Sequence, residues 1–250
     1  MTTERLRIGV QSWTLRNASF EEAIRVTAAA GLPFIQLSSA HIDPREGAPD
    51  LLRKRELMEA YGVIAHSFGV AETTTLEDEN RYLFEFAGLL GLELLVVEPR
   101  DPRALDSLER LAVEFAVDVA VHNHGTGTAY AEPGMLKALL AGRDRRLGAC
   151  LDSGWITAAG YDAADVFRQY EGRVLDIHLK DLLISAGGEI TQVALGEGGV
   201  NLTGLIDAAC ATGFGGLLAI ESDADLADAT EFVRSAKAFV TRSLAAHPER

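Results

Sequence analysis

Short apolar segments alternate with longer amphipathic segments along nearly the whole chain. The short segments are rich in Val, Ile and Leu, which predicts buried strands, and the longer ones, several ended by a glycine, predict helices. Eight strand–helix units follow one another at a spacing of about 25–30 residues, without a linker or low-complexity break. The predicted strands are residues 6–13, 34–37, 63–68, 94–99, 118–122, 147–152, 174–180 and 217–221. The predicted helices are residues 20–30, 50–61, 77–90, 101–115, 135–140, 163–170, 202–211 and 225–245.

This alternation constrains the fold because strands joined by helices pair in a parallel sheet. Eight units close naturally into a (β/α)8 barrel, so we expect a single TIM-barrel domain over residues 1–250. A doubly wound open sheet is the alternative, but it usually has fewer strands and gathers their ends in one crevice. With 48% hydrophobic residues, the chain can bury a core of barrel size.

Charge and cysteine content exclude several functional classes. The formal net charge of −14 disfavours binding to nucleic acid or to anionic membranes, because both need clustered Lys and Arg. No apolar run approaches the roughly 18 residues that span a bilayer. The polar first residues do not resemble a signal peptide. Only Cys150 and Cys210 are present, which argues against a disulfide framework and predicts a cytoplasmic location.

One predicted strand carries three ionisable side chains on a single face. In residues 175–181, apolar residues alternate with an acid, an imidazole and an ammonium, which are Asp176, His178 and Lys180. A period of two places these three side chains on the same face of the strand. Because an unpaired buried charge costs several kcal/mol, partners, a metal or a wet cavity must lie on that face.

Ionisable residues also end most of the other predicted strands. In a barrel of this type the C-terminal strand ends meet at one mouth, where catalytic residues lie. Strand alternation places Cys150 beneath Asp152 and Ala219 beneath Glu221, and such small residues would leave room for a metal and a ligand. The candidate site residues are His66, Glu98, His122, His124, Asp152, His178, Lys180 and Glu221.

Each candidate also has a purely structural interpretation. His66 would be a hydrogen-bonded core histidine, Glu98 an acid at a helix start, and Asp152 the cap of a turn. Lys180 would pair with the adjacent Asp181. The convergence of six strand ends on one mouth favours a functional site over these separate explanations.

Two tryptophans follow predicted strand ends. Trp13 and Trp155 would either pack against the barrel or stack on the apolar face of a sugar. Both alternatives stay open, and these two residues are grouped with His66 as candidate substrate contacts.

The donor types indicate a divalent metal. Carboxylates and imidazoles form a mixed oxygen and nitrogen site, which suits Mn²⁺, Mg²⁺, Co²⁺ or Zn²⁺. The absence of thiolate ligands from the candidates argues against a closed structural zinc site. Such a cation can bind a hydroxyl and the neighbouring carbonyl of a polyol and stabilise the enediolate formed when the α-proton leaves. A nearby glutamate can take that proton and return it elsewhere.

Several motifs resemble those of the xylose-isomerase-like TIM-barrel superfamily, which includes sugar and sugar-phosphate isomerases and epimerases and the inosose dehydratases. The motifs follow the family's order and cover nearly the whole chain. They are residues 8–16, 122–124, 151–155, 177–181, 195–198 and 220–221.

The resemblance implies a divalent metal held by an Asp after the sixth strand, a His on the seventh and a Glu after the eighth. These ligands map onto Asp152, His178 and Glu221. The family's remaining ligand, a Glu after the fifth strand, has no counterpart, since Ala120 stands where many epimerases carry it. Residues 122–127 are instead similar to the His-rich motif of inosose dehydratases.

We therefore expect Glu98 or His124 to complete the metal shell, with the other acting as a base or substrate contact. Glu98 and Glu221 are the candidate carboxylates for proton transfer. Lys180 would steady the developing oxyanion, and His122 would protonate a leaving hydroxyl.

The resemblance implies a metal-dependent isomerase or epimerase acting on a sugar or sugar phosphate. The alternatives are an inosose-type dehydratase acting on a keto-polyol and a non-catalytic sugar-binding barrel. A related endonuclease family uses the same barrel on abasic DNA, but Trp155 stands at one of its metal histidines and the acidic charge opposes DNA binding. The expected partner is a small sugar or polyol, with no nucleic acid and no membrane, and a homodimer would be unsurprising.

Overall fold

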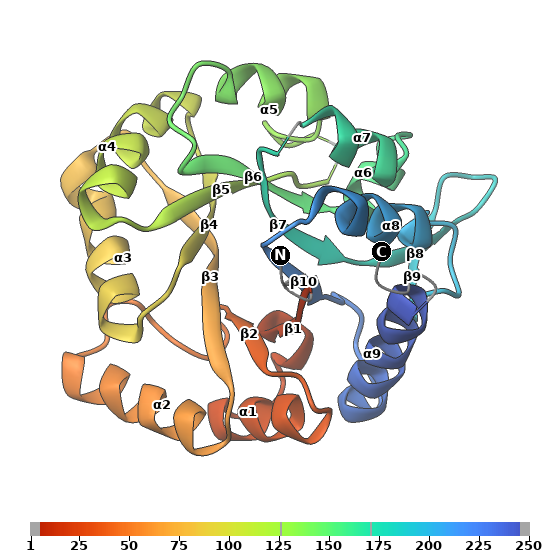
Figure 1. Ribbon diagram of the computed structural model, residues 1–250, viewed down its shortest axis with the longest axis horizontal. Coiled ribbons are helices and arrows are strands. Elements are labelled where there is room, and N and C mark those ends of the chain that lie inside the picture. Colours follow the sequence, from red (N-terminus) through yellow and green to blue (C-terminus); the bar gives the residue numbers. More distant parts are fainter. Residues whose placement is uncertain (1–5, 126, 171, 246–250) are drawn as a thin grey trace.

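The computed structural model describes residues 6–125, 127–170 and 172–245. Eight parallel strands form a closed barrel, in the order β1, β10, β7, β6, β5, β4, β3 and β2 around its wall. Helices surround this barrel, as Figure 1 shows. The expected (β/α)8 barrel is therefore confirmed. The barrel strands are β1 (Arg7–Gln11), β2 (Phe34–Leu37), β3 (Ile64–Thr73), β4 (Leu94–Pro99), β5 (Asp118–His122), β6 (Leu147–Asp152), β7 (Val174–Leu179) and β10 (Leu217–Ile220).

The helices begin and end at residues suited to those positions. The Ser19 hydroxyl caps α1 by accepting a hydrogen bond from the Glu22 backbone N–H. Helices α3 and α8 end at Gly91 and Gly213, whose φ angles are 69° and 66°. None of the helices in the described part of the chain is long and apolar enough to cross a membrane. The helices are η1 (Ser12–Leu15), α1 (Phe20–Ala29), α2 (Ala48–Ala60), α3 (Glu77–Leu90), η2 (Pro102–Ala104), α4 (Leu105–Phe115), α5 (Pro133–Leu140), α6 (Ser153–Ala158), α7 (Ala163–Gln169), α8 (Leu202–Thr212) and α9 (Ala229–Ala245).

The hydrophobic core has two parts because side chains alternate between the two faces of each barrel strand. The larger part lies between the barrel wall and the helices and includes the fully buried Ile35, Leu95 and Val119. A separate, smaller cluster lies inside the barrel. It consists of Leu94, Val96, Ala120 and Cys150, with Val70 and Leu175 packed against it. The polar residues of the same inward faces therefore lie toward the strand ends.

Strand β3 is longer than the sequence pattern predicts, and this changes the position of one candidate. The predicted strand ends at Phe68, whereas β3 continues to Thr73. Its register with β4 shifts after Phe68, where Gly69 approaches β4 so closely that a Cβ would lie 2.5 Å from the Val96 side chain. Because the strand continues, His66 lies near its beginning and not at its C-terminal end.

The predicted long loop after the seventh strand contains a short antiparallel hairpin. Its strands are β8 (Asp181–Ile184) and β9 (Ile190–Val193). The Asp181 carboxylate accepts hydrogen bonds from the backbone N–H groups of Gly196, Gly198 and Val200. Asp181 therefore organises the segment that leads from the hairpin to α8. Lys180 forms its ion pairs with other acids, at the mouth of the barrel.

Candidate metal centre

Four ionisable side chains gather at the C-terminal end of the barrel. His122, Asp152 and His178 lie on β5, β6 and β7, and Glu221 directly follows β10. Each offers one ligand atom, and these four atoms lie within 4.8 Å of one another. All four residues are buried, the most exposed being Glu221 at 7%. The fold therefore assembles two imidazoles and two carboxylates in one small volume.

Several atoms of this group have no hydrogen-bond partner. Both ring nitrogens of His122, Nδ1 of His178 and Oε2 of Glu221 are buried without one. His178 Nδ1 and Glu221 Oε2 nevertheless lie 2.7 Å apart. Each buried polar group left without a partner costs about 1–3 kcal/mol. A cation placed among these atoms would satisfy them, and their mixed nitrogen and oxygen chemistry fits a divalent transition metal.

Gln36 determines which nitrogen of His178 faces the group. The Gln36 amide donates through Nε2 to Ser67 Oγ and to the Asp176 carboxylate. Its Oε1 therefore faces His178 Nε2, at 2.7 Å. Because Oε1 can only accept, Nε2 must carry a proton, and Nδ1 is the nitrogen that faces Glu221. This is the arrangement that a metal-binding histidine requires.

Lys180 supplies the positive charge of the centre. Its Nζ lies 2.9 Å from Asp152 Oδ2, 3.5 Å from Glu221 Oε2 and 2.8 Å from Asp223 Oδ2. Burial opposes the charged form, but these three carboxylates raise the pKa of Lys180 above its ordinary value. Burial also works against ionisation of Glu221, whereas Lys180 and His178 hold the pKa of Glu221 well below its usual range.

The remaining imidazole of the group is neutral. Burial, together with the charge of His178, lowers the pKa of His122 well below its ordinary value. The rings of His122 and His178 lie 4.9 Å apart. A neutral imidazole keeps one lone pair available, so His122 can donate to a cation without losing a proton.

Glu98 and His124 form a separate pair at the rim. His124 Nδ1 lies 2.9 Å from Glu98 Oε2, and this hydrogen bond raises the pKa of His124. The His124 side chain is 45% exposed and the Glu98 side chain is 25% exposed. The ring of His124 also makes edge contacts with the rings of His122 and Trp155. Because β5 ends at His122, the chain turns and directs His124 to the rim. His122 therefore lies beside the three expected ligands, in the position that the sequence predicts for Glu98 or His124. The role that the sequence predicts for His122 itself is that of an acid.

A model of the xylose isomerase-like TIM barrel family matches residues 9–240. The chain belongs to this family. It is similar to the inosose dehydratase of Geobacillus thermodenitrificans, with 25% identity in an alignment 150 positions long that covers 54% of this chain and 50% of that protein. The chain spans about half the length of the curated relatives that it matches.

Solved structures show the same fold as this xylose isomerase-like barrel. The structure of L-ribulose 3-epimerase has a TM-score of 0.79 and 17% identity, covering 97% of this chain and 95% of that one. A structure of the IolI protein with a bound zinc atom has a TM-score of 0.77 and 15% identity, covering 98% of this chain and all of that one. These structural similarities concern the fold alone.

His66 lies at the opposite end of the xylose isomerase-like barrel. Its Nδ1 is 3.2 Å from the Arg7 guanidinium and 3.7 Å from Glu93 Oε2, and its ring packs edge-on against Phe34. Arg7 begins β1 and Phe34 begins β2, so these partners mark the N-terminal ends of the strands. The expectation that His66 contacts substrate at the mouth is therefore wrong, because β3 extends five residues beyond its predicted end.

The two tryptophans lie at the same end as the ligand group. Trp13 is in η1, directly after β1, and is 38% exposed, with the guanidinium of Arg16 5.5 Å from its ring. Trp155 is in α6, and its ring lies 5.2 Å from Lys180 Nζ. The Asp152 carboxylate caps α6 by accepting from the Trp155 backbone N–H. Trp155 is therefore held beside the ligand group by one of its members.

Sequence reasoning missed the supporting residues Gln36 and Asp223. Gln36 is the polar residue in an otherwise apolar predicted strand, and its inward face could have been read from the alternation. Asp223 pairs with Lys180 and also accepts from Gln192 Nε2 of β9. No local pattern indicates the contact with Gln192, because it joins β9 to the segment after β10, 31 residues away.

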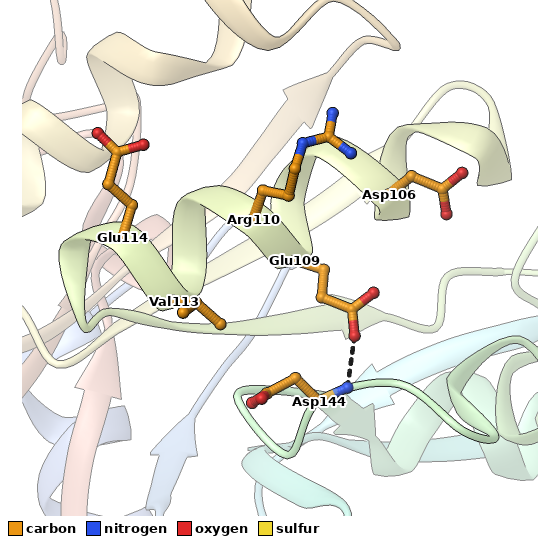
Figure 2. A pocket seen from close by; sticks show the side chains of 6 residues that line it. All are labelled: Asp106, Glu109, Arg110, Val113, Glu114 and Asp144. Atoms are coloured by element: carbon orange, nitrogen blue, oxygen red, sulfur yellow. Dashed lines mark hydrogen bonds between the residues drawn. The ribbon is translucent and has the colours of Figure 1, made fainter.

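A hollow of about 650 Å³ lies away from the ligand group, on the outer face of α4. Figure 2 shows its lining, in which the Glu109 carboxylate accepts a hydrogen bond from the Asp144 backbone N–H. Arg143 pairs with both Asp106 and Glu109. These acids are therefore neutralised by ordinary surface ion pairs, and the ligand group remains the stronger candidate site.

Proposed function

We propose that this protein is a divalent-metal-dependent isomerase or epimerase of a sugar or sugar phosphate, which removes a proton next to a carbonyl and returns it elsewhere. One observation carries the proposal. His122, Asp152, His178 and Glu221 converge from four strands into a buried group with unsatisfied ligand atoms, at the end of the barrel where this fold places its chemistry.

These four residues would hold the cation. When bound, Mn²⁺, Mg²⁺, Co²⁺ or Zn²⁺ supplies Lewis acidity toward a carbonyl and its neighbouring hydroxyl. Lys180 would place a second positive charge beside the oxygen on which negative charge develops, because its Nζ already lies between carboxylates of the group. The ammonium is buried and tightly paired, so it would stabilise the charge without itself giving up a proton.

Proton transfer needs groups on both sides of the substrate. Glu221 follows β10, whereas Glu98 lies near the end of β4 and His124 follows β5. Strands β7 and β6 separate these positions around the barrel wall. The hydrogen bond from His124 Nδ1 to Glu98 would leave His124 Nε2 as the exchanging nitrogen. A sugar bound between the two sides would meet one proton acceptor on each face, which is the arrangement that isomerisation or epimerisation requires.

Substrate recognition would use the aromatic residues of the mouth. Trp155 and Trp13 are proposed to stack on the apolar face of the sugar ring. The half-exposed His124 ring already contacts the indole of Trp155, with 5.9 Å between the ring centroids. Together the two rings would line one side of the substrate site.

The relatives support this chemistry. Sugar epimerases share the fold, the IolI structure holds a zinc atom, and an inosose dehydratase is similar in sequence. The last similarity favours dehydration of a keto-polyol as a second candidate. Dehydration begins with the same proton abstraction, and His124, at the exposed rim, could then protonate the departing hydroxyl.

The test is hydrogen exchange of metal-loaded protein in heavy water, over a panel of keto-sugars and keto-inositols. We expect deuterium to enter the carbon next to the carbonyl of at least one compound, and Glu221→Gln to abolish it. His66→Gln, at the other end of the barrel, is the control. Incorporation without water loss indicates an isomerase or epimerase, and a new enone absorbance indicates a dehydratase. Metal binding without exchange in any compound would contradict the proposal in favour of a binding protein.

A further inference from the structure

A second set of metal-ligating atoms lies beside the candidate metal centre and shares its two imidazoles. His122, Cys150 and His178 also offer three ligand atoms within 4.8 Å of one another. Cys150 is a free thiol on β6, fully buried, two residues before Asp152 on the same inward face. The thiol therefore lies one layer deeper in the barrel than the carboxylates of the mouth.

Strand pairing explains why this one cysteine reaches both imidazoles. Cys150 is directly opposite His122 across β5 and β6, and opposite Asp176, two residues before His178, across β6 and β7. The other members of the inner cluster are Leu94, Val96 and Ala120, none of which has a ligand atom in its side chain. Cys150 is thus the one sulfur donor among these residues, and the Asp176 carboxylate opposite it is already held by Gln36.

An independent observation indicates that this position can accept a ligand. His122 is 2% exposed, and neither of its ring nitrogens has a hydrogen-bond partner. Buried imidazoles normally find at least one partner. In His178 only Nδ1 is available, since Gln36 holds Nε2. The unpartnered ring of His122 and the Nδ1 of His178, which lies 2.7 Å from Glu221 Oε2, thus both lie within reach of the thiol.

We propose that His122, Cys150 and His178 form a second cation position that selects soft divalent ions, represented by Cd²⁺. Thiolate ligands favour soft ions, whereas carboxylates favour Mg²⁺ and Mn²⁺. A soft ion would displace the proton of the Cys150 thiol to solvent and form a metal–thiolate bond. Because both positions need the same imidazoles, one ion excludes the other.

In this arrangement, hard and soft cations bind at different depths in the barrel. A hard ion stays at the mouth with Asp152 and Glu221, next to bound substrate. A soft ion moves toward Cys150, leaving both carboxylates to Lys180, which already pairs with them. Soft ions would thus occupy the centre in an unproductive position. The inference concerns metal binding alone and does not depend on the substrate.

The experiment is titration of metal-free protein with CdCl₂, read by the ultraviolet charge-transfer absorbance of a cadmium–thiolate bond. We expect the absorbance to saturate at one equivalent in the unchanged protein and in Cys210→Ser, and to be absent in Cys150→Ser. Cys210 is the matched control, since it lies on α8, outside the centre. We expect Cys150→Ser to weaken Cd²⁺ binding by about ten-fold or more, with Mn²⁺ binding within about two-fold of the unchanged protein.

Three results would overturn the inference. These are equal absorbance in Cys150→Ser, no absorbance in the unchanged protein, and simultaneous binding of one Mn²⁺ and one Cd²⁺. Exclusion is measured by the release of free Mn²⁺ on adding Cd²⁺. Cys150→Ala provides a second variant, and circular dichroism confirms that each variant is folded. Since no substrate is present, a negative result here leaves the exchange test of the proposed function unaffected.

Discussion

Gln36 Oε1 lies 2.7 Å from His178 Nε2, across 142 residues of sequence, and this contact sets the tautomer of a proposed metal ligand. The Gln36 amide has only one possible orientation, because its Nε2 is held by Ser67 and Asp176, and this orientation leaves Oε1 facing His178. Gln36 is therefore a positioning residue, which acts on a cation through His178 without touching it.

Gln36→Leu is expected to weaken divalent-metal binding by about 10–100-fold, since the His178 ring loses the partner that fixes its orientation. Competition with a chromophoric chelator measures the Kd. Ser67→Ala is the control, because it removes one partner of Gln36 and leaves the contact to His178. Unchanged metal affinity in Gln36→Leu would show that the tautomer is not set by this amide.

Mutation can distinguish His122 from His124 as the fourth metal ligand. We expect His122→Ala to lose most of its bound metal after gel filtration and His124→Ala to retain a full equivalent, because only His122 belongs to the buried four-residue group of the described chain. Elemental analysis of the two purified variants gives the metal content. The opposite pattern would restore the expectation drawn from the sequence.

Lys180→Met is expected to destabilise the metal-free protein by about 3–5 kcal/mol, since two buried carboxylates lose the ammonium that neutralises them. A saturating divalent cation should recover much of this loss, because its charge replaces that of Lys180 among the same atoms. Urea unfolding with and without Mn²⁺ measures both quantities. A loss that Mn²⁺ does not reduce would argue against a cation site beside these carboxylates.

His66 makes folding stability depend on pH. Burial lowers the pKa of His66 to about 4, with Glu93 opposing and Arg7 assisting this shift. Between about pH 6.5 and pH 4 the unfolded chain binds this proton and the folded chain does not, so stability falls as the pH falls. We expect this residue to account for a loss of about 2–3 kcal/mol at pH 4.5 relative to pH 7.

Denaturant unfolding of the unchanged protein and of His66→Gln at the two pH values measures this contribution. The variant lacks the titrating ring, so it should lose less stability on acidification. Equal losses in the two proteins would mean that His66 titrates normally in the fold.

The strand–helix alternation was sufficient to predict the barrel, because the burial of each strand and helix is a local property that the residue types record. The same locality explains where prediction failed. The pattern of residues 63–68 contains no sign that β3 continues past Gly69, since that extension depends on pairing with β4. A histidine predicted at the mouth consequently lies at the other end.

The sequence by itself determined the fold class and the types of ligand available, and its pattern predicted that Asp152, His178 and Glu221 come from separate strand ends. The tertiary structure alone decided that His122 joins them while His124 turns to pair with Glu98 at the rim. Alternation holds only while a strand continues to pair with its neighbours, and β5 stops pairing at His122. The end of a strand is a property of the whole barrel, and so is the identity of the residue that the barrel leaves facing its centre.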